Sequence, residues 1–469
     1  MSRNYSCVIW SIAAASWLFA ASGARAQVFD SGPSDSSLFT AGVFNVPPDA
    51  APSSVGNLQQ LNLTAGGNLS SGFDANTGAE VNVNGGTIGS GFDAFSGSEV
   101  NISGGTFGGA FEAMPGSEVN ISGGTFGIFF DAASGSNVQL IGNEFQLNGV
   151  PFTGDSITLL NAFQSSPSPF PFASDVFTGT LQDGSTFIFA SELFANLEGV
   201  TLTRTPVPDI DLTPVVVDTP ITSGPSGLRA GQTLTLQEGG QLPDNFGVVG
   251  GTLNIEGGDA GFGAGVAGGV VNISGGTVDA LRVSSGSLVN INGGIVSNIV
   301  DINSNSVVNV SDGIVEGSLF VLGELNISGG AIEFGLFDLT VLDGGVANIS
   351  GGTIETSIET VEGSQVNISG GTFDEDFEVD SGSEVNLFGS DFALNGEQFE
   401  NLAIGQAFTI TDRGVTLTGV FADGEPFSFG LSTSDFDPDA TLTITLVPEP
   451  SSMALIAISG VAMFTRRRR

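Results

Sequence analysis

The segment Gly97-Ser98-Glu99-Val100-Asn101-Ile102-Ser103-Gly104-Gly105-Thr106-Phe107 is repeated along the chain, and this repetition predicts its fold. An identical copy follows 19 residues later at 116–126, and a related copy lies earlier, at 79–88. A more divergent copy at 137–145 keeps the same interval. A fixed period near 20 residues, built from β-type segments, is the signature of a solenoid.

The spacing of the apolar residues predicts short strands that stack in columns. Between the glycine corners, Val or Ile alternates with single polar residues, which favours strands over helices. At about 3.3 Å per residue, one repeat has a contour of about 60 Å, which suits one turn of a three-sided parallel β-helix. Turns stacked at about 4.8 Å place the in-phase side chains above one another inside the helix. The in-phase residues are Phe73, Phe92, Phe111 and Phe130 in one column, and Ile88, Phe107, Phe126 and Phe145 in a second.

The composition agrees with a folded, β-rich chain. The 469 residues include 70 glycines, which by themselves would also fit a low-complexity disordered chain. Hydrophobic residues make up 40% and charged residues 13%, so an apolar core can form. Disordered chains seldom keep Phe and Val in phase, so we expect a solenoid.

The charge distribution restricts the classes of partner. The formal net charge is −40, and the sequence contains neither Lys nor His. Six of the ten arginines lie in the first 25 or the last four residues, so only four stand among the 50 acidic residues between them. Such a surface repels nucleic acid and anionic lipid, and we expect neither as a partner. Divalent cations and cationic surfaces are compatible with this charge as partners.

The N-terminus is typical of a secretory signal peptide. An arginine near the start precedes an apolar run at 8–21, and Ala24-Arg25-Ala26 is a small-x-small cleavage site. We expect cleavage between Ala26 and Gln27. An uncleaved membrane anchor is the alternative, but the apolar run is short. Cleavage would remove Cys7, the only cysteine, so the exported chain would depend on its stacked core instead of disulfides.

We expect an all-β chain with two parallel β-helix (β-solenoid) arrays of about 19-residue coils, each followed by a β-rich capping segment. Segments 178–184 and 418–424 match at an offset of 240 residues, which indicates a tandem duplication of one module. A cap covers strand edges that would otherwise recruit other chains. The expected segments are a signal peptide (1–26), a lead-in (27–54), a first array of five coils (55–149), its cap (150–204), a linker (205–227), a second array of nine coils (228–394), its cap (395–446) and a C-terminal segment (447–469).

The C-terminal segment carries the most specific motif. Pro448-Glu449-Pro450 is followed by an apolar run at 453–464 and by four arginines at 466–469. This arrangement resembles the PEP-CTERM sorting signal, with Pro448, Glu449 and Pro450 as the sorting-signal residues. The arginines suit a positive-inside stop, although the apolar run is short for a hydrocarbon core of about 30 Å.

The resemblance implies export, transient anchoring in the inner membrane through the C-terminal segment, and processing by an exosortase-type enzyme. Proteins with this signal are commonly destined for the cell surface or the exopolysaccharide matrix of Gram-negative-type bacteria. Exopolysaccharide and other surface proteins are therefore the expected partners.

Residues suited to catalysis are scarce between the two ends of the chain. Without His, Lys and, after cleavage, Cys, the chain has no His-based proton shuttle, thiol nucleophile or Schiff-base lysine. We therefore expect a non-enzymatic structural or adhesin-like protein without catalytic residues or an organic cofactor. A polysaccharide-acting β-helix enzyme, a lyase or a glycosidase with paired carboxylates, is the alternative.

Two sets of acidic residues repeat in phase with the coils. The acidic column comprises Asp74, Asp93, Glu112 and Asp131, and the Glu80 column comprises Glu80, Glu99 and Glu118. Stacked carboxylates about 4.8 Å apart repel one another, and bound Ca²⁺ would reverse that repulsion. The acidic column is a weak candidate for calcium, and a solvated acidic face that limits aggregation is the favoured interpretation.

Overall fold

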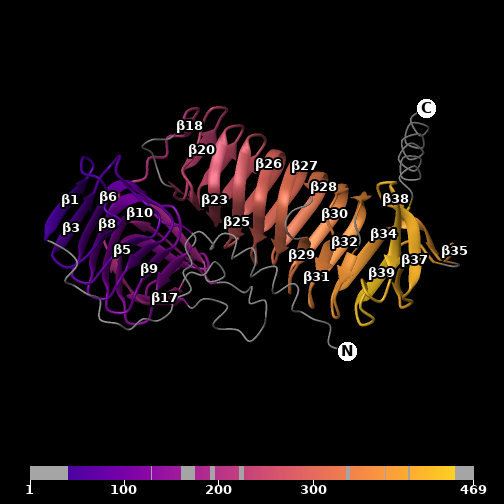
Figure 1. Ribbon diagram of the computed structural model, residues 1–469. Helices are drawn as coiled ribbons and strands as arrows, with labels where there is room; N and C mark the ends of the chain where they lie inside the picture. Colours follow the sequence, from indigo (N-terminus) through magenta and orange to yellow (C-terminus); the bar gives the residue numbers. More distant parts are fainter. Residues whose placement is uncertain are drawn as a thin grey trace, which may run out of the picture. The chain divides into compact units, whose positions relative to one another are not determined.

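The structure is a computed structural model that describes residues 41–127, 129–159, 175–190, 196–220, 227–333, 338–374, 377–399 and 402–448. Over these residues the chain consists of β-strands joined by turns, without a helix. Coils about 19 residues apart stack on one another, which confirms the predicted all-β solenoid (Figure 1). The strands belong to two sheets of 17 and 22 strands.

The first sheet is built from coils in parallel register. Its strands are β1 (Gly42–Val46), β2 (Ser54–Val55), β3 (Gln59–Leu63), β4 (Asn68–Leu69), β5 (Phe73–Ala75), β6 (Glu80–Ile88), β7 (Phe92–Ala94), β8 (Glu99–Phe107), β9 (Phe111–Ala113), β10 (Glu118–Thr125), β11 (Phe130–Ala132), β12 (Asn137–Leu147), β13 (Val150–Pro151), β14 (Ser156–Leu159), β15 (Val176–Leu181), β16 (Thr186–Ala190) and β17 (Asn196–Arg204). β3, β6, β8, β10 and β12 pair in parallel in that order, with Val81, Val100 and Val119 in register.

Several coils turn at a Ser-Gly-Gly corner, and Gly105 shows why glycine is required there. Gly105 has a φ of +95°, in the left-handed region. A Cβ on Gly105 would lie 3.0 Å from a side-chain carbon of Val83 and 3.2 Å from the Gly85 carbonyl oxygen, both in the preceding coil. The corner glycine therefore lets the chain change direction while adjacent coils remain in close contact.

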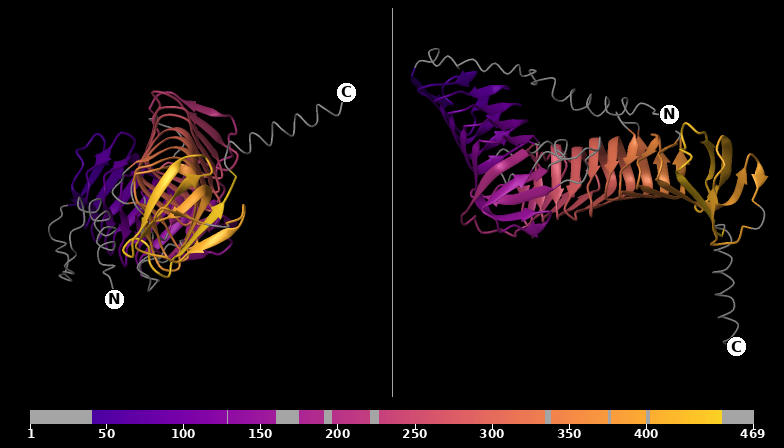
Figure 2. Two further views of the ribbon diagram at one scale, coloured as in Figure 1. Left: turned by 90° about the vertical axis from the view of Figure 1, so that its right-hand side faces the viewer. Right: turned by 90° about the horizontal axis from the view of Figure 1, so that it is seen from below.

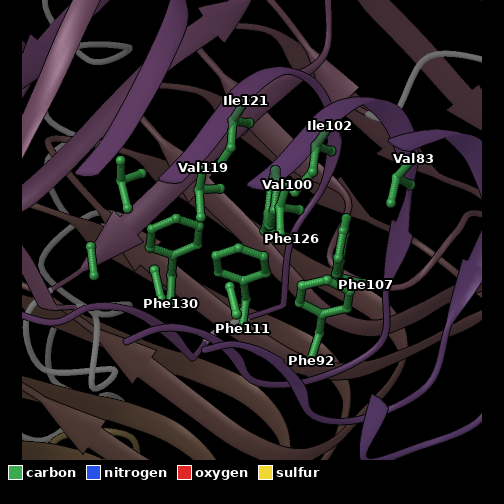
Figure 3. Packing of buried hydrophobic residues seen from close by; sticks show 14 of the residues in the cluster. Val83, Phe92, Val100, Ile102, Phe107, Phe111, Val119, Ile121, Phe126 and Phe130 are labelled. Atoms are coloured by element: carbon green, nitrogen blue, oxygen red, sulfur yellow. The ribbon is translucent and has the colours of Figure 1, made fainter. Parts of the chain in front are cut away.

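Stacked aromatic side chains fill the first array (Figure 3). The Phe111 ring lies between Phe92, at a centroid distance of 5.4 Å, and Phe130, at 5.0 Å. In the second column, Phe107 and Phe126 stack at 4.9 Å, and each meets Phe111 edge to face. All five side chains are buried, which confirms the inward placement of these residues.

Phe145 does not continue the second column, so that part of the prediction is wrong. β12 pairs in parallel with β10 as far as Leu140 and then becomes antiparallel to β15. Phe145 consequently packs against Phe177 of the cap, at 5.9 Å, whereas Phe189 of the cap stacks on Phe130 at 4.4 Å and meets Phe126 edge to face at 6.3 Å. The phase ends here because the cap, and not a further coil, covers the last coil of the array.

Antiparallel strands close the first array. β15 and β16 form a hairpin, and β15 also pairs with the end of β12. β17 then returns to pair in parallel with β12, and antiparallel β14 pairs with β17. These strands occupy the edge that the last coil would otherwise leave open, as expected of a cap.

The second sheet repeats this design. Its strands are β18 (Val215–Val217), β19 (Gly227–Leu228), β20 (Thr233–Leu236), β21 (Gly247–Val249), β22 (Thr252–Ile255), β23 (Asp259–Ala267), β24 (Val270–Ile273), β25 (Thr277–Ser284), β26 (Leu288–Ile302), β27 (Val307–Val321), β28 (Glu324–Glu333), β29 (Leu339–Val341), β30 (Val346–Ile354), β31 (Ile358–Thr360), β32 (Gln365–Phe373), β33 (Phe377–Val379), β34 (Glu384–Leu394), β35 (Glu397–Gln398), β36 (Ala407–Ile410), β37 (Val415–Phe421), β38 (Pro426–Leu431) and β39 (Thr441–Leu446). β34 to β39 reproduce the pairing of β12 to β17 strand for strand, which supports a duplicated module.

Parallel stacking begins earlier in each sheet than the expected array boundaries. β1 lies in the lead-in (27–54), and its Phe44 pairs with Leu61. β18 lies in the linker (205–227), and its Val217 pairs with Leu236. A short apolar run is enough for a strand once a neighbouring coil offers its edge. The lead-in and the linker therefore each contribute one strand to a stack of coils, and Figure 2 shows such stacks from two further directions.

Candidate functional site

The structure places the four residues of the acidic column on successive coils. β5, β7, β9 and β11 are three-residue strands in which an acidic residue stands between Phe and Ala. Parallel pairing sets Asp93 between Asp74 and Glu112, and Glu112 between Asp93 and Asp131. The Phe and Ala side chains are buried and the acids are half-buried, so the carboxylates face away from the core.

The acidic column ends at an amide of the first cap. Asn196 pairs with Asp131, and its Nδ2 donates a hydrogen bond to Asp131 Oδ1 at 3.0 Å. The sequence analysis did not identify Asn196, which lies 65 residues away and outside the repeat. No signal in the periodic pattern points to it.

Burial and mutual repulsion raise the pKa values in the acidic column. Burial is the larger cause for Asp93, whose pKa rises from 3.8 to about 6, and the charge of Asp74 is the second cause. Burial likewise raises the pKa of Glu112 from 4.5 to about 7, with further contributions from Asp93 and Asp131. The pKa of Asp131 is also raised by burial, although the hydrogen bond from Asn196 opposes this shift. Glu112 is therefore partly protonated at neutral pH.

The acidic column is linear, and its residues do not enclose an ion. Among the described residues, no group of three or more His, Cys, Asp or Glu side chains is arranged to hold one metal ion. A cation at the acidic column would accordingly bridge neighbouring carboxylates and complete its oxygen shell with water. Calcium binding by Asp74, Asp93, Glu112 and Asp131 stays a prediction.

Asparagine side chains form a second, neutral column beside the Glu80 column. The Nδ2 of Asn82 donates to Asn62 at 3.1 Å, that of Asn101 to Asn82 at 3.2 Å, and that of Asn120 to Asn101 at 3.0 Å. The second array repeats this pattern from Asn272 to Asn386. Each amide acts as both donor and acceptor, so the columns help to keep successive coils in register. The signal was present in the sequence as an Asn between the two phased aliphatic residues.

The second array carries an acidic column that the sequence analysis missed. The Glu359 column consists of Thr340, Glu359 and Glu378, which are in register on β29, β31 and β33. Thr340 Oγ1 donates a hydrogen bond to Glu359 Oε2 at 3.1 Å. Burial, followed by the charge of Glu378, raises the pKa of Glu359 from 4.5 to about 7. The signal was an acid between two inward-facing residues, in Ile358-Glu359-Thr360 and again 19 residues later in Phe377-Glu378-Val379.

Two of the ion pairs among the described residues tie neighbouring segments together. Arg282 Nε lies 3.3 Å from Asp301 Oδ2, and both side chains are largely buried. Burial raises the pKa of Asp301, and the charge of Arg282 opposes that shift. Arg204 lies 3.2 Å from Asp155, whose side chain is 96% exposed, so this pair contributes little to stability.

The sorting segment follows the last strand of the second cap. β39 ends at Leu446, and the N–H of Val447 donates to the Gly389 carbonyl oxygen at 2.8 Å. Pro448 is described, whereas Glu449, Pro450, the apolar run and the arginines lie outside the described residues, as do Ala26 and Gln27. Within the described residues, no helix is long and apolar enough to cross a membrane.

Comparison with known families identifies the C-terminal segment. Residues 446–469 match the family model of the PEP-CTERM protein-sorting motif. The chain therefore carries this motif, which points to an exported, cell-envelope-associated protein and implies processing by an exosortase. Neither the curated proteins nor the solved structures include a significant match to this chain.

Proposed function

We propose that the chain is a non-enzymatic structural or adhesin-like protein of the cell surface or exopolysaccharide matrix of a Gram-negative-type bacterium. The observation that carries the proposal is the junction at residue 446, where the last strand of the second cap ends and the sorting motif begins. Sorting through this motif would deliver a complete β-solenoid to the envelope. Exopolysaccharide and other surface proteins are the proposed partners.

The β-solenoid suits a spacer or matrix component. Each coil adds about 4.8 Å of length to a stack. The formal net charge of −40 keeps chains apart in solution, and cationic groups on a matrix polymer or a surface protein would complement it.

A polysaccharide-acting enzyme remains the second candidate, since stacked carboxylates with raised pKa values include potential acid catalysts. To separate the two candidates, cells that express the full chain are fractionated, and the purified chain is incubated with exopolysaccharide from the same cells. We expect surface or matrix localisation and co-sedimentation with the polymer, whose length stays constant. Shortening of the polymer that Glu112→Gln or Glu359→Gln abolishes would overturn the structural role.

A further inference from the structure

The outer face of the first cap hairpin is covered, whereas the matching face of the second cap hairpin is exposed. In β16, Thr186 is buried and Ile188 is half-buried, although both alternate with the core phenylalanines of that strand. In β38, which has the same place in the second cap, the corresponding Pro426 and Ser428 are exposed. Among the described residues, the first hairpin is therefore covered by a segment that has no equivalent at the second hairpin.

Three glycines from the opening coils of the second array provide this cover. Gly227, Gly247 and Gly265 stand in register on β19, β21 and β23, and we call them the glycine stripe. Thr186 Oγ1 donates a hydrogen bond to the Gly247 carbonyl oxygen at 3.3 Å. A Cβ on Gly265 would lie 3.1 Å from Ile188 Cδ1, and one on Gly227 would overlap Thr186 Oγ1.

The φ values of the three glycines lie outside the left-handed region, so backbone conformation does not require glycine there. The close contact with Thr186 and Ile188 of the hairpin does. The same face of the first array carries acidic residues. Both arrays begin with the same turn, in which a Gln side-chain oxygen accepts a hydrogen bond from the N–H of Gly56 or of Arg229. Counted from that turn, Gly247 stands where the first array has Asp74. The second array thus has glycine, where the first array has a carboxylate, on the face that contacts the hairpin.

An ion pair between Arg229, whose side chain is buried, and Glu144, whose side chain is 42% exposed, joins the same two segments. Arg229 is only 6% exposed, and it donates from Nε to Glu144 Oε2 at 3.1 Å and from Nη2 to Glu144 Oε1 at 2.6 Å. Its Nη1 donates to the Pro208 carbonyl oxygen at 2.7 Å, and Thr180 Oγ1 donates to Glu144 Oε2 at 2.7 Å. Asp391 has the place of Glu144 in the second cap.

We propose that the outer face of the first cap is a docking surface for the next module of this chain, whereas the matching face of the second cap is exposed among the described residues. The hairpin docks on the glycine stripe, and the Glu144–Arg229 pair stabilises this docked arrangement. The first module, the linker and the opening coils of the second array belong to one compact unit of the chain, which agrees with this coupling. The inference goes beyond the proposed function, since it makes the modules mechanically coupled and not merely tethered.

Thiol labelling tests the docking in the full chain with Cys7→Ser as background. Ile188→Cys should be alkylated more slowly than Ser428→Cys by about tenfold or more, because the junction must open first. Adding Gly247→Asp, which puts the residue type of the acidic column on the glycine stripe, should bring the Ile188→Cys rate up to the Ser428→Cys rate. Equal rates in the chain without Gly247→Asp would overturn the proposal.

A designed disulfide tests the geometry and the role of the ion pair. A Cβ on Gly265 would lie 4.0 Å from Ile188 Cβ, which is within the range of about 3.5–4.5 Å for a disulfide. Ile188→Cys combined with Gly265→Cys should therefore cross-link on mild oxidation. Glu144→Gln should slow this cross-linking, whereas the matched change Asp391→Asn should not. Two free thiols after oxidation would overturn the docking. Equal cross-linking rates for the Glu144→Gln and Asp391→Asn variants would overturn the stabilising role of the Glu144–Arg229 pair.

Discussion

Asp183 Oδ2 accepts a hydrogen bond from the N–H of Gly124 at 3.0 Å, so the turn of the first cap hairpin covers a glycine corner of the array. The second module repeats the contact, with Asp423 Oδ2 accepting from the N–H of Gly371 at 2.8 Å. Both cap hairpins place a carboxylate on the equivalent glycine corner. The contact is therefore a candidate for an important stabilising element of each module.

Replacement of this carboxylate should destabilise its own module. Asp183→Ala leaves the N–H of Gly124 without that acceptor, which should lower the free energy of unfolding by about 1–3 kcal/mol. Asp423→Ala should act in the same way on the second module. Denaturant unfolding measures both, with Asp155→Ala as the exposed control, which should cost less than about 1 kcal/mol. A cost for Asp183→Ala no larger than that control would contradict the assignment.

A charge in the aromatic column should open the first array. Phe111 is fully buried between Phe92 and Phe130, so Phe111→Asp places an unpaired carboxylate in the core, at a cost of several kcal/mol. Phe111→Leu should cost less, because it only removes packing. Thermal unfolding monitored by circular dichroism measures the effect, and Phe408→Asp, at a 44% exposed position, is the control. An unchanged melting temperature for Phe111→Asp would contradict the inward placement of this column.

The first array should lose stability as the pH rises toward neutrality. The folded pKa values of Asp93 and Glu112, about 6 and about 7, exceed the ordinary values of 3.8 and 4.5, so the folded state binds more protons between these limits. The free energy of unfolding therefore falls as the pH increases from about 4 to about 7.

Melting temperatures at pH 5 and pH 7.5 test this dependence. Asp93→Asn combined with Glu112→Gln should flatten the slope. Glu99→Gln combined with Glu118→Gln removes the same charge from the exposed Glu80 column and serves as the control. A slope that the first double variant leaves intact would show that other groups control it.

Calcium should stabilise the first array through Asp74, Asp93, Glu112 and Asp131. A cation that binds only the folded column stabilises it by about 2.7 kcal/mol at a hundredfold excess over its dissociation constant. Sodium at equal ionic strength screens the carboxylates without bridging them. Melting curves in the two salts are compared with and without Asp93→Asn plus Glu112→Gln. If calcium raises the midpoint no more than sodium does, the acidic column is a solvated face.

Deletion of residues 448–469 should release the chain, unprocessed, into the periplasm or the medium, because it removes the matched sorting motif. Cell fractionation and immunoblotting measure the distribution. Glu449→Gln tests the motif itself, and Asp209→Asn in the similar Val207-Pro208-Asp209 is the matched control. Normal surface attachment of the deletion variant would contradict sorting through this segment.

Much of the candidate site could be predicted from the sequence. The acidic column was found from Asp74, Asp93 and Glu112 because each follows a phased Phe. The Glu359 column follows a similar rule, with Ile358 before Glu359 and Phe377 before Glu378, but its third member is Thr340, so the repeated acid is less evident in the sequence. The pKa values could not be predicted, because they depend mainly on how far the surrounding chain buries each carboxylate.

The coil, its period and its inward columns follow from the amino-acid sequence, since identical residues at a constant interval are all buried only when successive coils lie in parallel register. The tertiary structure alone decided where the columns end and what covers them. Phe145 leaves its column for the cap, Asn196 ends the acidic column, and Arg229 meets Glu144 across 85 residues. Such contacts join segments that share no period, so only the folded chain brings them together.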